Sequence, residues 1–292
     1  MTSGHPLRAP RFCKGTIVNI PSIPLNDGNA IPSVGLGLWR VTDEEATQIV
    51  REGVECGYRS LDTATLYGNE AGVGAGIREC GLPREQLFIA TKLWNDSHGY
   101  DATMRAFDES MKRLRLEYLD LYLIHWPVAG SELYLDSWRA FIKLREEGRV
   151  RSIGVSNFLA RHLRRVIETS GVTPAVNQIE SHPYFKQSDL LEADREAGIL
   201  TEVWAPLGRA TVFTDPVITE IAGNHGKTPA QVVLRWHVER GVVAIPKTVR
   251  KERMLENIAV FDFSLTAGER AAIDAIDTVH RISADPETYT GL

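Results

Sequence analysis

Short apolar runs alternate with amphipathic stretches along most of the chain. Eight apolar or β-branched runs recur, and the intervals between them carry the spacing of helices that bury one face. Runs that stay apolar from end to end are typical of parallel strands, which are covered on both faces. The eight predicted strands begin at Val34, Arg59, Leu87, Asp120, Arg151, Ala175, Leu200 and Val242.

Capping residues mark the predicted helices. One helix follows the N-cap candidate Thr42 and stops at Gly57, and another follows Thr228, with Pro229 at its first position. Seven further helices are predicted, each placed by a residue at one or both of its ends. They are one after Asp101, one from Leu133 to Glu147, one that ends at Gly171, one between Ser188 and Gly198, one from Asp215, one that begins near Lys251 and one after Thr266.

This alternation predicts the fold class. Eight strand–helix units within 292 residues fit a (β/α)8 barrel, the TIM barrel. An open doubly wound sheet would more often show a glycine fingerprint after its first strand. Before the first unit, two apolar stretches flank the turn sequence Asn26–Asn29 and predict a β-hairpin. We expect residues 1–15 to form a loose tail and residues 16–292 to form one domain, with a polar tail loop over 279–292.

Composition and charge exclude several classes of protein. Apolar residues make up 43% and charged residues 24%, as in ordinary globular proteins, and the net charge of −5 gives no general attraction to nucleic acid or anionic lipid. No apolar run reaches the length of a membrane span, and the N-terminus lacks the apolar core of a secretory signal. Three widely spaced cysteines argue against a disulfide framework, so we expect a cytoplasmic protein.

Two glycine-containing segments resemble nucleotide-binding motifs without matching them. Gly226-Lys227-Thr228 looks like the end of a phosphate-binding loop, but the position that needs the first glycine is Ile221. The run Gly72–Gly76 lacks the dinucleotide spacing, and we interpret it as helix packing. The histidines show no spacing that a transition-metal site would need, so no metal is expected.

Four ionisable residues stand at the carboxyl ends of adjacent predicted strands. Asp62 ends the second strand, Tyr67 follows one short loop later, Lys92 ends the third and His125 ends the fourth. Each alone has an ordinary structural explanation, as a cap, a packed ring, a surface lysine or a core histidine. Because barrel active sites lie at this end of the strands, we expect all four in one mouth.

The residue types indicate the chemistry. A nearby ammonium is expected to lower the pKa of Tyr67, and Asp62 to supply the counter-charge that keeps a buried Lys92 protonated. A neutral His125 could hydrogen-bond a carbonyl oxygen. The set suits protonation of an oxygen that becomes an alkoxide, and it fits hydrolysis poorly because no nucleophile–base pair is present.

Several segments resemble the hallmark segments of the aldo-keto reductase superfamily: LDTATLYGNE, TKLWND, DLYLIHWP, GVSNF, NQIESHPY and IPKTVRKERMLENI. The resemblance covers about Ile17 to Pro286, and HGKTPAQVVLRWH and FDFSLT place it nearest the bacterial 2,5-diketo-gluconate reductase type. It implies a (β/α)8 barrel with the hairpin across its bottom, and NADPH-dependent carbonyl reduction without a metal.

The resemblance also implies roles for individual residues. The catalytic residues would be Asp62, Tyr67, Lys92 and His125, with Tyr67 as proton donor. Trp39, Tyr67, Trp94, His125 and Trp126 would contact the substrate. The cofactor would be held by Gly37, Leu38, Trp39, Asp62, Ser156, Asn157, Gln178, Trp204, Ala205, Leu207, Gly208, Lys247, Thr248, Val249, Arg250, Arg253, Glu256 and Asn257.

The function expected from these residues is reduction of small aldehydes, dicarbonyl compounds or keto-sugars by a monomeric enzyme. Two alternatives stay open. A cofactor-binding regulatory protein could use the same scaffold with little turnover, although the intact tetrad counts against it. An unrelated barrel hydrolase or isomerase would need a metal set or paired catalytic carboxylates, which the sequence does not offer.

Overall fold

The eight predicted strands form one parallel sheet that closes on itself. A computed structural model describes residues 18–291, so the expected tail over residues 1–15 lies outside the described residues. The sheet order runs from β10 to β3, and parallel bridges Val34↔Ala244 and Gly37↔Lys247 join its two edges. The strands are β3 (Leu36–Gly37), β4 (Ser60–Asp62), β5 (Phe88–Leu93), β6 (Leu119–Ile124), β7 (Val150–Ser156), β8 (Val176–Glu180), β9 (Leu200–Trp204) and β10 (Val243–Ile245).

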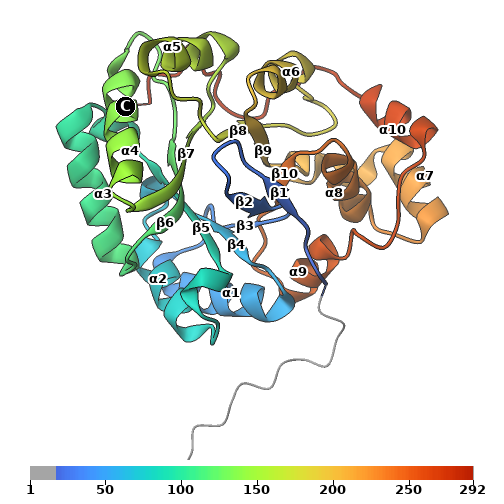
Figure 1. Cartoon of the computed structure of the whole chain (residues 1–292). Helices are drawn as coiled ribbons and strands as arrows, with labels where there is room; N and C mark the ends of the chain where they lie inside the picture. The colour runs from blue at the N-terminus through green and yellow to red at the C-terminus, as the bar shows by residue number, and fades with distance from the viewer. Residues whose placement is uncertain (1–17, 292) are drawn as a thin grey trace, which may run out of the picture.

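Helices surround the barrel as a ring (Figure 1). The helix after Asp101 begins earlier than predicted, at Tyr100. The run Gly72–Gly76, interpreted from the sequence as helix packing, lies within a helix that spans Glu70–Glu79. The helices are α1 (Asp43–Cys56), α2 (Glu70–Glu79), α3 (Tyr100–Leu114), α4 (Leu133–Glu146), α5 (Ala160–Ser170), α6 (Ser188–Glu196), α7 (Pro216–His225), α8 (Pro229–Glu239), α9 (Lys251–Ile258) and α10 (Ala267–Asp274).

Local sequence explains where helices begin and end. Thr42 and Glu45 form the reciprocal capping box of α1, and Gly57 ends that helix in the left-handed conformation at φ 117°. Thr228 caps α8 in the same way, with Pro229 at its start. The caps supply hydrogen bonds to backbone groups that the helix itself leaves unpaired.

The hairpin of β1 (Ser22–Pro24) and β2 (Ala30–Pro32) lies across the amino ends of the strands, in front of the barrel in Figure 1. Asn26 donates to the carbonyl oxygens of Pro174 and Gly198, which precede β8 and β9. Leu25 and Ile31 of the hairpin belong to a buried cluster inside the barrel. The hairpin therefore closes the bottom, as the resemblance implied, and leaves the carboxyl ends of the strands for a site.

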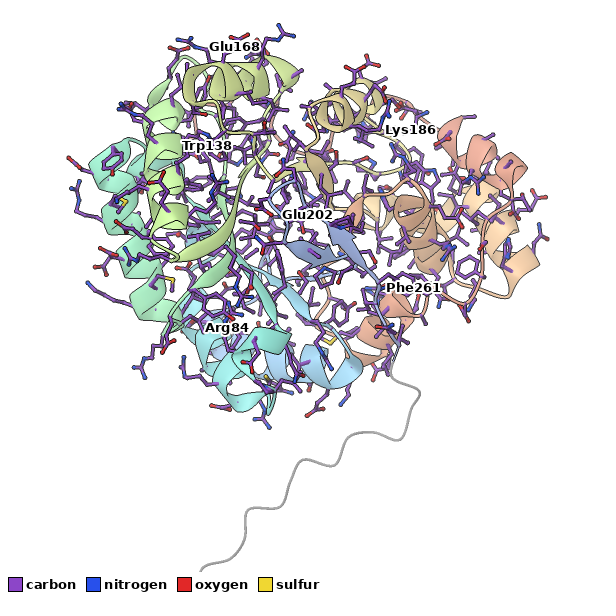
Figure 2. All side chains as sticks on the ribbon, in the orientation of Figure 1. Arg84, Trp138, Glu168, Lys186, Glu202 and Phe261 are labelled. Atoms are coloured by element: carbon purple, nitrogen blue, oxygen red, sulfur yellow. The ribbon has the colours of Figure 1, made fainter. Side chains whose placement is uncertain are left out.

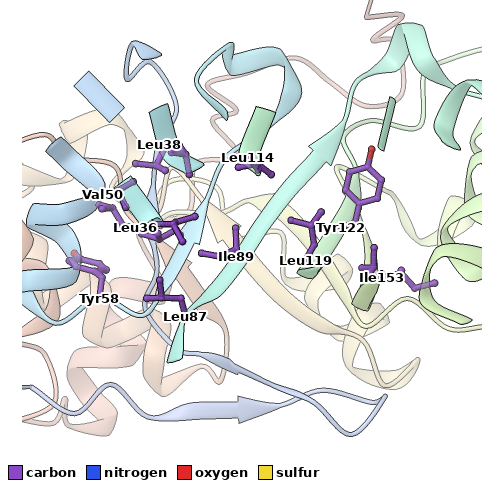
Figure 3. Close-up of a cluster of buried hydrophobic side chains, with 14 of the residues drawn as sticks. Leu36, Leu38, Val50, Tyr58, Leu87, Ile89, Leu114, Leu119, Tyr122 and Ile153 are labelled. Atoms are coloured by element: carbon purple, nitrogen blue, oxygen red, sulfur yellow. The ribbon is translucent and has the colours of Figure 1, made fainter. Parts of the chain in front are cut away.

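A larger apolar core fills the space between strands and helices. Leu36, Ile89 and Tyr122 from the strands pack with Val50 of α1 and Leu114 of α3 (Figure 3). Close packing of this kind holds the strand ends in fixed relative positions.

The glycine run of α2 allows that helix to approach its neighbours. A Cβ on Gly72 would lie 2.1 Å from the carbonyl oxygen of Asp43, and one on Gly74 would lie 2.1 Å from that of Leu114. Neither distance is compatible with a side chain. The run is thus a packing feature, as the sequence interpretation held.

The chain from Val279 to Gly291 has no regular secondary structure and returns to the mouth of the barrel. The backbone N–H of Ala129 donates to the carbonyl oxygen of Tyr289, and the guanidinium of Arg161 pairs with Glu287. Among residues 18–291, no helix is both long and apolar enough to cross a membrane.

Candidate active site

Three strand ends and one short turn bring the expected tetrad into one mouth. Asp62 is the last residue of β4, Lys92 lies near the end of β5, and His125 directly follows β6. Tyr67 ends η1 (Thr65–Tyr67), a single 3-10 turn after β4. The strand order places β4, β5 and β6 side by side, so the four side chains converge at the carboxyl end of the barrel.

A buried ion pair lies at the floor of this mouth. The ammonium of Lys92 donates to Asp62 Oδ1 at 2.6 Å, to Asp62 Oδ2 at 2.8 Å and to the carbonyl oxygen of Thr63 at 2.9 Å. The Lys92 side chain is fully buried. Its Nζ atom lies 5.2 Å from the centre of the Tyr67 ring, so the ammonium acts on the phenol through its charge.

The charge of Lys92 depends on its partner. Burial alone would lower the pKa of this ammonium, but Asp62, with smaller effects from Tyr67 and Glu202, outweighs burial, and the pKa lies above its ordinary value. Lys92 therefore stays protonated across the neutral range, as the sequence argument expected.

The pKa of Tyr67 corrects one expectation. Burial raises the pKa of this phenol above its ordinary value, and the opposing effect of Lys92 offsets burial only in part. The expected net lowering is wrong, because sequence reasoning counted the ammonium and not the loss of hydration around the phenol. Tyr67 is accordingly protonated at neutral pH, which is the form that an acid needs.

His125 completes the tetrad as a neutral ring. Burial, and then the charge of Lys92, hold its pKa well below the ordinary value for histidine. Its ring stands edge-on to Tyr67 at 6.0 Å and to Trp94 at 5.2 Å between centres. Its Nδ1 atom is buried without a hydrogen-bond partner among residues 18–291. A neutral imidazole at this position can hydrogen-bond a carbonyl oxygen.

Asn157 links the ends of β6, β7 and β9. It follows β7 in the left-handed conformation, at φ 62°. Its Nδ2 donates to the carbonyl oxygen of His125 at 2.9 Å, while its Oδ1 accepts from Trp204 Nε1 at 3.0 Å. These bonds fix the amide of Asn157 and the plane of the Trp204 indole.

A cavity of about 680 Å³ opens above the tetrad. Its volume lies within the range of small-molecule sites. Of the residues expected to contact cofactor or substrate, it is lined by Gly37, Trp39, Asp62, Tyr67, Trp94, His125, Trp126, Asn157, Gln178, Trp204, Ala205, Leu207, Lys247, Thr248, Arg253, Glu256 and Asn257.

The other expected residues lie off this cavity. The side chain of Leu38 is fully buried in the apolar core, and Ser156 donates its hydroxyl to the carbonyl oxygen of Gln178. Val249 and Arg250 are exposed at the start of α9, and Gly208 lies in the loop after β9. Lys92 lies below the cavity, behind Asp62, and is not part of the lining. These side chains can support the site but do not form its wall.

Sequence reasoning missed several residues that line the cavity. Tyr289, far along the chain, packs its ring 4.4 Å from that of Trp126. Arg209, in the short loop η4 (Gly208–Thr214), places its guanidinium 5.3 Å from the centre of the Trp39 ring. Neither residue stands in a recognisable motif, so only the folded chain reveals these contacts.

The residues present fit a dinucleotide phosphate cofactor. Lys247 and Arg253 bring cations to one part of the cavity wall, beside the backbone N–H groups at the start of α9. Trp204 and Gln178 bring an aromatic face and an amide to another part, next to the tetrad. Within residues 18–291 there is no group of three or more His, Cys, Asp or Glu side chains that could hold a metal ion.

Comparison with known proteins agrees with this geometry. Residues 33–278 match the Aldo/keto reductase family. An aldo-keto reductase of Mycolicibacterium smegmatis is 50% identical over 269 residues, which cover 92% of this chain and 98% of that protein. The methylglyoxal reductase DkgA of Salmonella typhimurium is 47% identical over 277 residues, which cover 94% of this chain and 100% of that protein.

Solved structures give the same result. An aspartate-to-alanine variant of Gox0644, in complex with NADPH, superposes with a TM-score of 0.89 at 46% sequence identity. The match covers 93% of this chain and 99% of that one. Fold and sequence similarity thus extend together over nearly the whole chain.

Proposed function

Because this chain belongs to the aldo/keto reductase family and is an NADPH-dependent carbonyl reductase, we propose that it reduces small aldehydes and dicarbonyl compounds with Tyr67 as the proton donor. One observation carries the proposal. A buried Asp62–Lys92 ion pair lies beside the protonated phenol of Tyr67, at the floor of a cavity that also contains neutral His125. This arrangement supplies a proton to an oxygen without a metal.

NADPH, when bound, supplies the hydride that adds to the carbonyl carbon. Tyr67 donates its phenolic proton to the carbonyl oxygen, and the electron pair of the O–H bond stays on the phenolate. The Lys92 ammonium stabilises that phenolate through its charge, and Asp62 keeps the ammonium in place. His125 orients the carbonyl oxygen through a hydrogen bond from its neutral ring.

The remaining wall of the cavity would hold the cofactor and shape the substrate space. We assign the adenosine phosphate to Lys247 and Arg253, and the nicotinamide to Gln178, Asn157 and the indole of Trp204. The aromatic rings Trp39, Trp94, Trp126 and Tyr289 would exclude water around the carbonyl.

The substrate class follows from this aromatic lining. A mouth formed mainly by aromatic rings suits small aldehydes and dicarbonyl compounds, and keto-sugars can stack their apolar faces on such rings. The name of the DkgA relative makes methylglyoxal the first dicarbonyl to examine.

Assembly and location are part of the same proposal. We propose a monomer in the cytoplasm; the odd number of widely spaced cysteines supports a reducing compartment. Size-exclusion chromatography with light scattering would test the monomer, and a mass twice that of one chain would contradict it.

A carbonyl panel tests the proposed function. Loss of NADPH absorbance is followed with methylglyoxal, short aldehydes, simple ketones and keto-sugars. We expect turnover with methylglyoxal or a short aldehyde. If NADPH binds and no carbonyl in the panel is reduced, the alternative of a cofactor-binding regulatory protein replaces this proposal.

A further inference from the structure

A carboxyl group outside the tetrad is joined to it by one amide. Gln178 on β8 and Glu202 on β9 stand opposite one another in the strand register. Gln178 Nε2 donates to Glu202 Oε2 at 2.7 Å and to Asp62 Oδ2 at 2.9 Å. Both hydrogens of the amide are thereby used, so the side-chain oxygen, Oε1, is the group that Gln178 presents to the cavity it lines.

Glu202 occupies the interior of the barrel. Its label lies near the centre of the molecule in Figure 2, and only 1% of the residue is exposed. Side chains alternate along a strand, so Glu202 and Trp204 of β9 share a face. Glu202 therefore lies behind the part of the wall that we assign to the nicotinamide.

The charged and titratable groups that face Glu202 belong to the tetrad. They are Asp62 from β4, Lys92 from β5 and Tyr67 from η1. Lys92, the one buried ammonium among residues 18–291, pairs directly with Asp62, and its charge offsets the effect of burial on Glu202 only in part. Burial, and then the charge of Asp62, raise the pKa of Glu202 to about 8.

We propose that Glu202 is a positioning residue. While the Glu202 carboxyl group is neutral, it fixes the amide of Gln178 for the nicotinamide. Once Glu202 is ionised, it favours binding of NADP⁺ over binding of NADPH. This inference rests on the proposed function, because it uses the nicotinamide placement given there. The oxidised nicotinamide ring carries a positive charge that the reduced ring lacks. A carboxylate in a water-poor interior attracts that charge and has little effect on the neutral ring.

The consequence is a proton-linked change in cofactor preference. As the pH rises through the pKa of Glu202, binding of NADP⁺ should tighten relative to NADPH. The ribose phosphate titrates in both cofactors, so its effect cancels in the ratio of their dissociation constants. Neither Tyr67 nor Lys92 titrates in this range, because both pKa values are raised above their ordinary values.

The test measures dissociation constants of NADPH and NADP⁺ by quenching of tryptophan fluorescence, between about pH 6.5 and pH 9.5. In the wild-type protein, the ratio of the NADPH constant to the NADP⁺ constant should rise at least about threefold across this range. In Glu202→Gln, which keeps an oxygen to accept from Gln178, both cofactors should still bind and the ratio should stay flat. In Glu202→Leu, both cofactors should bind about threefold to tenfold more weakly, because Gln178 loses a hydrogen-bond partner.

Asp194→Asn is the matched control. Asp194 of α6 is also buried, and burial raises its pKa to about 7, but it accepts from Asn177 and Thr201 and does not line the cavity. This variant should change the melting temperature and leave the pH dependence of the ratio as in the wild type. If the role of Glu202 were purely structural, Glu202→Gln would likewise change the melting temperature and leave the pH dependence of the ratio as in the wild type.

The outcomes separate the two proposals. If the wild-type protein binds both cofactors with a ratio that does not change with pH, the role of Glu202 is overturned while the proposed function stands. A pH-dependent ratio that survives in Glu202→Gln would also overturn it. If the wild-type protein binds neither cofactor, the proposed function itself fails.

Discussion

Lys92 is important for the site because its side chain is buried. Three hydrogen bonds to Asp62 and Thr63 hold the ammonium in a fully buried position. A charge in such a place acts strongly on its neighbours because little solvent screens it. Lys92 therefore limits how far burial raises the pKa of Tyr67, and this effect is central to proton donation.

Lys92→Met tests this effect. Without the ammonium, the pKa of Tyr67 should rise further, because only burial and the nearby carboxylates remain. The acid form exists below the pKa, so the fall in rate on the alkaline side should move to higher pH while the rate at neutral pH drops about 10²-fold or more. The measurement is a pH–rate profile of NADPH oxidation, with circular dichroism to confirm that the variant folds. A profile identical to that of the wild type would refute the pairing.

His125 is predicted to act in turnover rather than in cofactor binding. Because burial and Lys92 keep its ring neutral, its titration should produce no change in rate between about pH 6 and pH 7.5. His125→Gln should lower kcat with a methylglyoxal substrate and leave the NADPH dissociation constant within about twofold. A lower melting temperature with unchanged kcat would instead assign His125 to packing alone.

At the scale of elements, the approach of α2 to its neighbours depends on glycine. Gly74→Ala would push a Cβ against the backbone of Leu114, where a flexible side chain cannot move aside. We expect a loss of about 1–3 kcal/mol in the free energy of unfolding, measured in urea. The matched control is Gly223→Ala in α7, whose Cβ would meet no atom within 4 Å. That change should stabilise the protein by up to about 1 kcal/mol, and equal effects of the two substitutions would disprove the packing argument.

The elements are also the part of the molecule that the sequence predicts best. All eight runs form strands, and Thr42, Thr228 and Gly57 cap helices where their residue types indicate. These signals are local: a cap or an alternating pattern lies within one turn or one strand. The tetrad could be predicted from the sequence for the same reason, because each of its members lies near the end of a strand or follows one.

Features that depend on residues far apart were not predictable in this way. Tyr289 meets Trp126, and Gln178 bridges Asp62 and Glu202, only because the barrel closes. The rise in the pKa of Tyr67 was missed for a related reason: burial depends on all the surrounding elements, whereas a charged neighbour can be inferred from two strand ends.

At the scale of the whole molecule, charge is distributed unevenly. The chain carries a net charge of −5, yet residues 247–253 hold four cations and one anion. Within this segment, Lys247 and Arg253 line the cavity. A cluster of cations at the start of a helix gains nothing from the helix dipole. Lys251 pairs with Glu55, and for Lys247 and Arg253 we propose a phosphate ligand.

The double variant Lys247→Ala with Arg253→Ala tests cofactor selection. Each charge-assisted bond to the ribose phosphate of NADPH contributes about 1.5–3 kcal/mol, so NADPH should bind about 100-fold more weakly or worse. NADH lacks that phosphate and should bind almost as in the wild type. Equal weakening of both cofactors, or a wild-type preference for NADH, would show that this cluster does not recognise the phosphate.

The proton donor is the central claim for the whole molecule, and Tyr67→Phe tests it most directly. This substitution removes the phenolic oxygen and keeps the ring that lines the cavity. The rate of NADPH oxidation with a good aldehyde is compared between wild type and variant, beside the NADPH dissociation constant of each. Loss of a general acid predicts a rate lower by about 10²–10⁴-fold with cofactor binding nearly unchanged. A purified variant that keeps more than about a tenth of the wild-type rate would contradict the assignment of Tyr67.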